Sequence, residues 1–274
     1  MGTPAPGGVG NKITEEEKEM KTWKGILFVL LCCSVMVACG GGDDSASQSD
    51  QSTADLSSTE QAQLVAATLS TDQGGVGKDI ATVAKPASLQ TQASGQASLT
   101  VSAKIEYSDA DGHYQDNYDA ATTDHIKYKS QITGKLTTNA CYFQDLSIDN
   151  GSEFIVDGLT TGSAVINGAH HNHSHYVRKA TFNSNQVSFD LACDLSLSGV
   201  IVDMNTTDCI PEEGTIEGSI AGSYVRNGAH ANISKQINFQ FTVTYMGDNT
   251  AEIQVSGNAV FSVNLNTGAV TETD

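Results

Sequence analysis

The chain has 274 residues, a length that allows one sizeable domain with a tail, or two small domains. Its 32 acidic residues against 14 basic ones give a formal net charge of -18 at pH 7. Because a surface this acidic repels phosphate groups, nucleic acid is excluded as an expected partner. Charged residues make up only 17% of the chain, so its polarity comes mainly from Ser, Thr, Asn, Gln and Gly.

The first recognisable element is an uncharged apolar run over residues 26–38, with two lysines just before it. The run is shorter than the roughly 20 residues that a membrane-spanning helix needs, and it is typical of the core of a signal peptide. The acidic stretch 15–19 is atypical of such a leader. We therefore expect translation to start at Met20, which makes residues 1–19 a mis-assigned upstream extension and residues 20–38 the signal peptide.

The run ends in Met36-Val37-Ala38-Cys39, which resembles the lipobox of bacterial lipoproteins apart from Met36 in place of the commonest leucine. The resemblance implies a type II signal peptide, cut so that Cys39 becomes the mature N-terminus and carries a diacylglycerol. Together with a further acyl chain this is a stable membrane anchor, since each buried CH₂ contributes about 0.8 kcal/mol. Gly40 in place of an aspartate implies sorting to the outer membrane. The alternative is a plain secretory signal peptide that is cut elsewhere.

Residues 39–96 are expected to be the lipidated cysteine followed by a flexible linker. A composition so rich in Ser, Thr, Gln, Ala and Gly buries too little apolar surface to offset chain entropy. Within it, 60–69 is a candidate for a short helix. The sequence GGVGKD at 74–79 shares its last part with phosphate-binding loops, but Asp72 and Asp79 replace the glycine and the hydroxyl residue that such a loop requires. We therefore reject a phosphate site.

From residue 97 to the end of the chain, apolar and polar residues alternate with period two. This alternation predicts antiparallel strands with one buried and one solvated face, and helical spacing is nearly absent. The clearest stretches are 99–107, 126–136, 187–197, 237–245 and 253–265. We therefore expect residues 97–274 to form one β-rich domain.

Two Asn-Gly pairs, at 167–168 and 227–228, lie between strand-like stretches. They predict tight hairpin turns, because asparagine and glycine accept the positive φ that such turns need. The pairs belong to two similar segments, GSAVINGAHHN at 162–172 and GSYVRNGAHAN at 222–232. This similarity indicates that one structural unit is used twice.

The expected unit is a three-stranded repeat, with copies at about residues 154–203 and 214–265. The expected fold is all-β: a single antiparallel β-barrel, or a strongly curved β-meander, of about eight or nine strands. Closure or strong curvature is favoured because open strand edges invite aggregation. A β-sandwich is the alternative fold. The scarcity of aromatic residues argues against a barrel that crosses the membrane.

The sequence HHNHSH at 170–175 is the most distinctive cluster. On a strand His171, His173 and His175 point the same way, with about 6.6 Å between successive side chains. Neutral imidazoles suit Zn, Cu or Ni, and an Asp or Glu from a neighbouring strand would complete such a site. His170 recurs in the second similar segment, so we attribute it to the hairpin. A solvated polar hairpin and a pH-sensitive patch are the alternatives.

The segment DADGHYQDNYD at 109–119 places Asp109 and Asp111 in a loop between two strands. Alternate carboxylates followed by a glycine are typical of a calcium loop. However, Gly112 follows the second carboxylate too early, and no glutamate stands at the twelfth position. The alternative is an acidic hairpin loop that its charge keeps soluble.

Three cysteines lie in the expected mature domain, Cys141, Cys193 and Cys209. In an oxidising compartment they can form one disulfide at most, and the similar sequences before Cys141 and Cys209 favour that pair. Cys193 lies on the apolar face of its predicted strand, where a small thiol packs well.

No nucleophile elbow, zinc-protease motif or haem-attachment motif is present, so we expect neither enzymatic activity nor a resident cofactor. The expected function is that of an outer-membrane lipoprotein, facing the periplasm or the cell surface, with a non-catalytic domain that binds a protein or small ligand of the cell envelope or has a structural role. The lipidated cysteine, the glycine-rich linker and the β-meander resemble the architecture of surface lipoprotein receptors of Gram-negative bacteria. No family is identified for residues 97–274. The alternative is a periplasmic or surface protein that binds Zn, Cu or Ni through His170–His175, with calcium less favoured.

Overall fold

The computed structural model describes residues 52–53, 55–69, 76–84, 99–139, 142–180, 186–206, 209–228, 232–256 and 259–273. All of them belong to one compact unit, Gly42–Asp274. The predicted leader, the lipobox and Cys39 lie outside the described residues. In the part of the chain that is described, no helix has the length and apolar character to span a bilayer.

Within the described segments, twelve strands join in one sheet. In chain order they are β1 (Ser52–Thr53), β2 (Leu99–Ser108), β3 (Tyr114–Gln115), β4 (His125–Asn139), β5 (Tyr142–Asp157), β6 (Ser163–Ala180), β7 (Gln186–Asp203), β8 (Pro211–Asn227), β9 (Asn232–Gly247), β10 (Thr250–Val255), β11 (Val260–Asn264) and β12 (Val270–Glu272). The helices are α2 (Ser58–Leu69), α3 (Val76–Val83) and the short 3₁₀ helix η1 (Leu159–Thr161).

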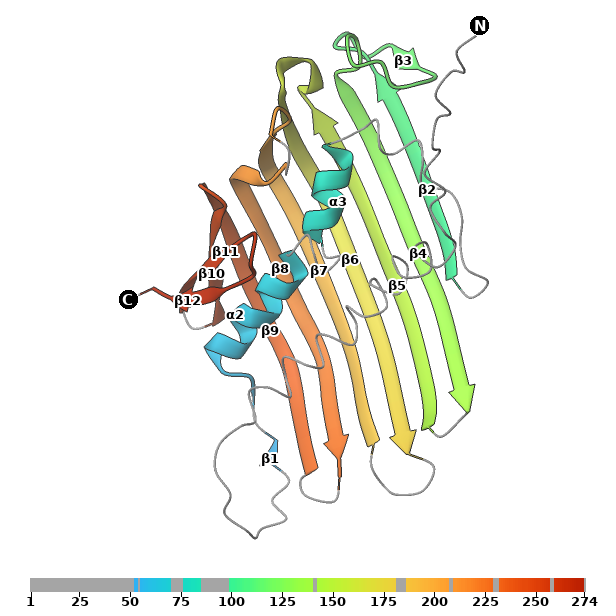
Figure 1. Cartoon of the computed structure of the whole chain (residues 1–274), viewed down its shortest axis with the longest axis vertical. Helices are drawn as coiled ribbons and strands as arrows, with labels where there is room; N and C mark the ends of the chain where they lie inside the picture. The colour runs from blue at the N-terminus through green and yellow to red at the C-terminus, as the bar shows by residue number, and fades with distance from the viewer. Residues whose placement is uncertain are drawn as a thin grey trace, which may run out of the picture. The chain divides into compact units, whose positions relative to one another are not determined.

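The long strands pair antiparallel with their neighbours in the chain and form an up-and-down meander (Figure 1). The order across the sheet is β12-β11-β10-β9-β8-β7-β6-β5-β4-β2-β3, and β1 adds a short parallel pairing to β9. Among the described strands, β12 and β3 end this order without pairing to each other, so the sheet is open. The expected all-β, mostly antiparallel fold is confirmed, but the described residues form neither a closed barrel nor a two-sheet sandwich. The strands outnumber the eight or nine expected partly because β1, β3 and β12 are too short to show alternation.

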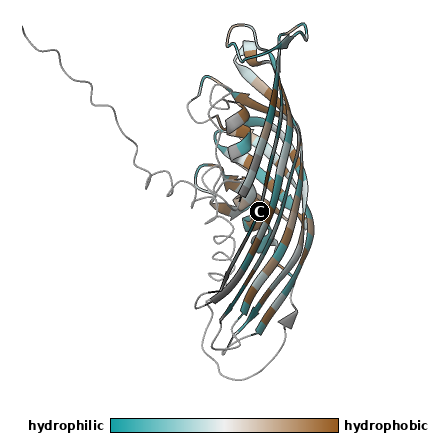
Figure 2. Cartoon of the chain, turned by 90° about the vertical axis from the view of Figure 1, so that its right-hand side faces the viewer, coloured by the Kyte–Doolittle hydropathy of each residue, from teal (hydrophilic) through white to brown (hydrophobic). Residues whose placement is uncertain are grey.

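The two faces of the sheet differ in polarity, as the alternation predicted. In β7, Phe189, Cys193, Leu195 and Leu197 are buried, and Asp194, which lies between two of them, is exposed. We call the face that carries the buried set the inner face and the opposite one the outer face. Helices α2 and α3 lie against the inner face (Figure 2). Other strands add their largest buried side chains to the inner face: Phe154, Ile166, Ile220, Phe241, Ile253 and Phe261.

Helix α2 begins with a reciprocal cap. The Glu60 backbone N–H donates to Ser57 Oγ at 3.3 Å, and the Ser57 backbone N–H donates to Glu60 Oε2 at 2.9 Å. Such a Ser-x-x-Glu cap satisfies N–H groups that the first turn of a helix leaves without partners. The helix buries Val65 and Leu69, and Lys235 Nζ on β9 donates to Glu60 Oε1 at 2.6 Å. Apolar contact and an ion pair therefore hold α2 on the sheet.

Helix α3 buries Val76, Ile80 and Val83 completely. The structure thus differs from the expected flexible linker at residues 58–69 and 76–83, and the short helix expected at 60–69 is present as α2. Overall composition did not predict this result, because it does not register that the apolar residues of each segment are spaced so that they gather on one side of a helix.

The Asn-Gly pair at 167–168 does not form the predicted hairpin. It lies inside β6, where the pairing with β7 shifts its register between Ile166 and Gly168. Gly168 has a φ of +148°, and a Cβ there would come within 2.1 Å of the Glu153 carbonyl oxygen on β5. Glycine is therefore needed for a bulge and a close strand approach, and a turn is not formed.

The second Asn-Gly pair does stand at the end of β8, with Asn227 as its last residue. However, the last β8–β9 pair joins Asn227 to Asn232, so the connection is longer than a two-residue turn. The similar segments consequently occupy different places. Segment 162–172 covers the first half of β6, whereas 222–232 crosses the β8–β9 connection. The predicted three-stranded repeat is therefore not a repeat of the fold.

Candidate functional site

The histidine cluster divides between the two faces of the sheet. His171 and His173 are exposed and His175 is partly exposed on the outer face of β6, as the alternation predicted, while His170 is buried on the inner face. The bulge at Gly168 precedes all four residues and sets which residues of β7 lie opposite them. His175 pairs with Asp190, and His171 pairs with Asp194.

Asp190 contacts two of the outer histidines. Its Oδ1 lies 2.6 Å from His173 Nε2, and its Oδ2 lies 3.1 Å from His175 Nδ1. Hydrogen bonding, first from His173 and then from His175, holds the pKa of the Asp190 carboxyl below its ordinary value. The carboxylate therefore stays ionised at neutral pH and supplies the acidic neighbour that the sequence could not identify.

His171 belongs to a different group. Its Nε2 lies 3.8 Å from Asp149 Oδ1 on β5. Its ring covers Gly151, where a Cβ would lie only 2.3 Å from the ring Cε1. The predicted set of three histidines thus separates into a pair that shares Asp190 and a single residue that faces Asp149.

A polar hollow of about 730 Å³ lies beside the histidines. Four consecutive strands line it, from β7 to β10, and its lining includes Asp194, the partner of His171 across β6 and β7. The exposed side chains of the lining place the hollow on the outer face: Asp194, Ser196, Glu217, Gln240, Gln254 and Ser256. Carboxylates, amides and hydroxyls therefore offer both donors and acceptors to a polar ligand. The sequence did not single out this site, because its members are far apart in the chain.

A serine, a histidine and an aspartate meet on the inner face, but they are not arranged as a hydrolytic triad. Ser152 Oγ donates to Asp79 Oδ2 at 2.5 Å and lies 2.8 Å from His170 Nδ1. The same Nδ1 lies 3.4 Å from Asp79 Oδ2. In a triad the imidazole stands between the hydroxyl and the carboxylate and uses both ring nitrogens. Here one nitrogen faces both groups, and the contacts join helix α3 to β5 and β6.

Ser152 and His170 are buried, so this cluster also satisfies polar groups inside a mostly apolar face. The sequence alone did not predict this cluster. The hairpin hypothesis accounted for His170, and no role was predicted for Asp79 once a phosphate-binding site at 74–79 was rejected. The signal that could have found it is the position of Asp79 next to Ile80, between the other buried residues of α3.

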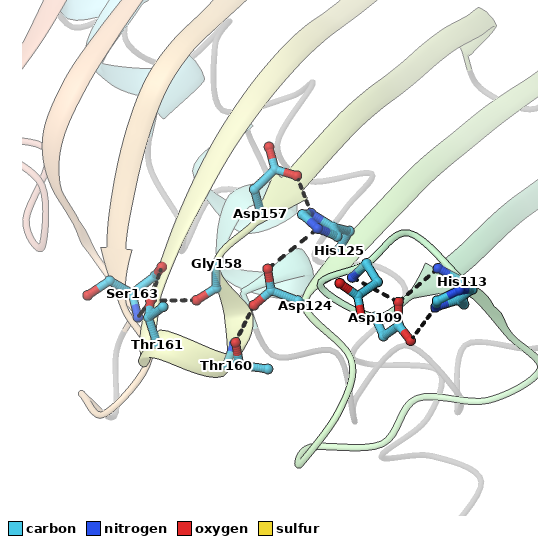
Figure 3. A network of polar contacts seen from close by, with 10 residues as sticks. Asp109, His113, Asp124, His125, Asp157, Gly158, Thr160, Thr161 and Ser163 are labelled. Atoms are coloured by element: carbon cyan, nitrogen blue, oxygen red, sulfur yellow. Dashed lines mark hydrogen bonds and ion pairs between the residues drawn. The ribbon is translucent and has the colours of Figure 1, made fainter.

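The loop after β2 brings Asp109 and Asp111 close to His113. Among the described residues, these three form the group whose potential ligand atoms all lie within 4.8 Å of one another. Asp109 Oδ1 accepts the backbone N–H groups of Asp111 at 3.0 Å and His113 at 2.8 Å, and Oδ2 lies 3.1 Å from His113 Nδ1 (Figure 3). The backbone N–H of His113 is the main cause of a lowered pKa for Asp109. The Asp109 carboxylate therefore closes the loop.

A second polar network lies at the same end of the sheet (Figure 3). His125 Nδ1 lies 2.7 Å from Asp157 Oδ1, and its Nε2 lies 3.5 Å from Asp124 Oδ2. Asp124 accepts the Thr160 backbone N–H at 3.1 Å and the Thr160 hydroxyl. These contacts connect the start of β4 with the end of β5 and with η1.

Cys193 and Cys209 are both buried, and Cys193 lies on the inner face as expected. Cys141 lies outside the described residues, so its pairing with Cys209 remains a prediction.

Comparisons with known proteins identify no relative. The chain matches no protein-family model, and neither a curated protein nor a solved structure matches it. Function is therefore inferred from the residues and their geometry.

Proposed function

We propose that this protein is a lipid-anchored component of the bacterial outer membrane whose β-rich domain acts as a non-catalytic binding module. The proposed anchor is Cys39, which would carry acyl chains such as palmitate after removal of the signal peptide 20–38. The lipobox-like sequence before Cys39 supports this location. Attachment to a membrane raises the local concentration of the domain, so weak binding to envelope partners becomes effective.

The observation that carries the binding role is the polar hollow on the outer face. One side of the sheet is taken up by its own helices and core, whereas the other presents an exposed surface of long, regular strands. Asp194 and Glu217 in the hollow, within a chain of net charge -18, favour a cationic or neutral partner that is rich in hydrogen-bonding groups. Anionic partners are disfavoured for the same reason.

A non-catalytic role is supported by the contacts of the side chains that could otherwise act as nucleophiles, acids or bases. The buried Ser152–His170–Asp79 contacts hold a helix on the sheet, and the carboxylate of Asp109 is bonded to its own loop. Both clusters therefore stabilise the fold through these contacts.

Photo-crosslinking in bacterial cells that make the full chain tests the proposal. A photoreactive amino acid replaces Thr242, which lines the hollow, or Thr137, which is exposed on the outer face of β4 away from it. We expect light-dependent adducts of defined mass from the position of Thr242 and none from the position of Thr137. Equal adducts at both positions, or none at either, would contradict a binding role for the hollow.

A further inference from the structure

We propose that His173, His175 and Asp190 form a binding site for a divalent transition metal on the outer face of β6 and β7. The proposed site is independent of the polar hollow and of the lipid anchor. It differs from the set expected from the sequence, because it excludes His171 and names the carboxylate that completes it.

The geometry of Asp190 carries this inference. Each of its two carboxylate oxygens faces a different imidazole nitrogen, at 2.6 Å for His173 Nε2 and 3.1 Å for His175 Nδ1. Two imidazoles and one carboxylate are a ligand set that suits Zn, Cu or Ni. These ions bind nitrogen and oxygen at about 2.0–2.2 Å, so the ion takes the place of the protons now shared between the rings and the carboxylate.

The backbone and the exposure of the side chains permit this exchange. His173 and His175 are separated by one residue on a strand, so both point outward, and Asp190 is the register partner of His175. The side chains of His173, His175 and Asp190 are 57%, 38% and 51% exposed, which leaves them free to rotate toward one ion. Their exposure also leaves open coordination positions for water or for a partner's ligand.

His171 is excluded by its surroundings. Its ring lies over Gly151, and its nearest carboxylate is Asp149 at 3.8 Å. To join the site, the ring would have to leave the glycine and turn along the strand past His173. The acidic character of the chain, with a net charge of -18, favours any divalent cation but does not distinguish between positions.

The loop cluster around Asp109 is the competing candidate, since its potential ligand atoms are closer together. However, Asp109 Oδ1 already accepts two backbone N–H groups, and these contacts close the loop. A metal there would have to replace loop contacts, whereas at Asp190 it replaces only side-chain hydrogen bonds. The pair on β6 is therefore the better site.

Copper(II) is the probe of choice, because sites of this kind bind Cu²⁺ more tightly than Ni²⁺ or Zn²⁺. The full chain is titrated with Cu²⁺ against a competing chelator, and the bound ion is examined by electron paramagnetic resonance. We expect one site per chain whose spectrum shows coupling to two nitrogen nuclei. The variants His173→Gln, His175→Gln and Asp190→Asn should each weaken binding at least about 10-fold, since even loss of an outer-shell partner costs about 10–100-fold.

Two variants serve as matched controls, with circular dichroism to verify that every variant folds. His171→Gln removes an exposed imidazole from the same strand, and Asp109→Asn disables the loop cluster; both should bind Cu²⁺ like the unmodified chain. A spectrum without nitrogen coupling in the unmodified chain would overturn the proposal. So would a loss of affinity in His171→Gln equal to that in His173→Gln, or a loss of the nitrogen-coupled site in Asp109→Asn.

Discussion

His125 lies between two carboxylates at the edge of β4, with Asp157 at 2.7 Å and Asp124 at 3.5 Å. The hydrogen bond to Asp157 is the main cause that raises the pKa of His125 above its ordinary value, and burial acts in the opposite direction. A raised pKa in the folded state means that folding favours the charged imidazole. Its stabilising effect is therefore complete below the unfolded pKa of about 6.5 and is lost as the pH rises through the folded pKa.

We accordingly expect His125→Gln to lower the free energy of unfolding more at acidic than at alkaline pH. The loss should stay below about 1 kcal/mol, because ion pairs that are a third or more exposed contribute little. Urea unfolding of both proteins at about pH 5.5 and about pH 8.5 measures the difference. His113→Gln, in the exposed loop, is the control for a general histidine effect. A difference that does not change with pH would contradict this account.

The outer histidines show what can be read from a sequence at this scale. Their common direction follows from the period of a strand, and His171, His173 and His175 do lie on one face. The identity of the carboxylate does not follow, because it depends on the register between β6 and β7. The shift at Gly168 sets that register, and a one-residue slip would turn every side chain of the strand to the other face.

At the scale of elements, long strands were the most predictable part of the fold, since alternation extends over many residues. The stretch 187–197 became part of β7 and 237–245 part of β9, with their apolar sets on one face. The helices were harder to predict. A sequence signal for α2 existed in the cap from Ser57 to Glu60. Helix α3 is only eight residues long and has a glycine in its first turn, so the surrounding composition predicted a linker.

The docked helices lead to a prediction about stability. Ile80 of α3 is completely buried, so Ile80→Ala should lower the free energy of unfolding by about 2–5 kcal/mol. The exposed Thr59 of α2 is the control, and Thr59→Ala should change it by less than about 0.5 kcal/mol. Chemical denaturation of the full chain measures both. If the segment were a flexible linker, the two substitutions would have the same small effect.

For the whole molecule, the sequence could predict the class of fold but not whether the sheet closes into a barrel. Alternation is a local property, whereas a barrel closes only if the first and last strands meet with matching tilt and stagger. Here β3 and β12 remain at opposite ends of the strand order. The hairpin turn predicted at Asn167-Gly168 is wrong for the same reason, because the dipeptide is also a local signal. It has the composition of a turn but lies inside β6, between β5 and β7.

The proposed location can be tested on the whole protein. In bacterial cells that make the full chain, Cys39→Ala should abolish incorporation of labelled palmitate and release the protein from the membrane fraction. The physical reason is that two or more acyl chains are needed for stable attachment, and this residue would supply them. Cys141→Ala is the control and should keep the label. Continued labelling of the Cys39→Ala protein would exclude the lipobox assignment.

The order of the strands also bears on how the sheet is assembled. From β5 to β12, each strand pairs with the one that directly precedes it in the chain, so loop closures are short and little entropy is lost at each step. The contact between Glu60 and Lys235, by contrast, joins residues 175 positions apart. If the chain crosses a membrane in extended form, each hairpin can join the growing sheet in the order in which it emerges from the membrane. Helix α2 can form its ion pair with the inner face only after β9 has joined the sheet, whereas the contacts of α3 with β5 and β6 can form earlier.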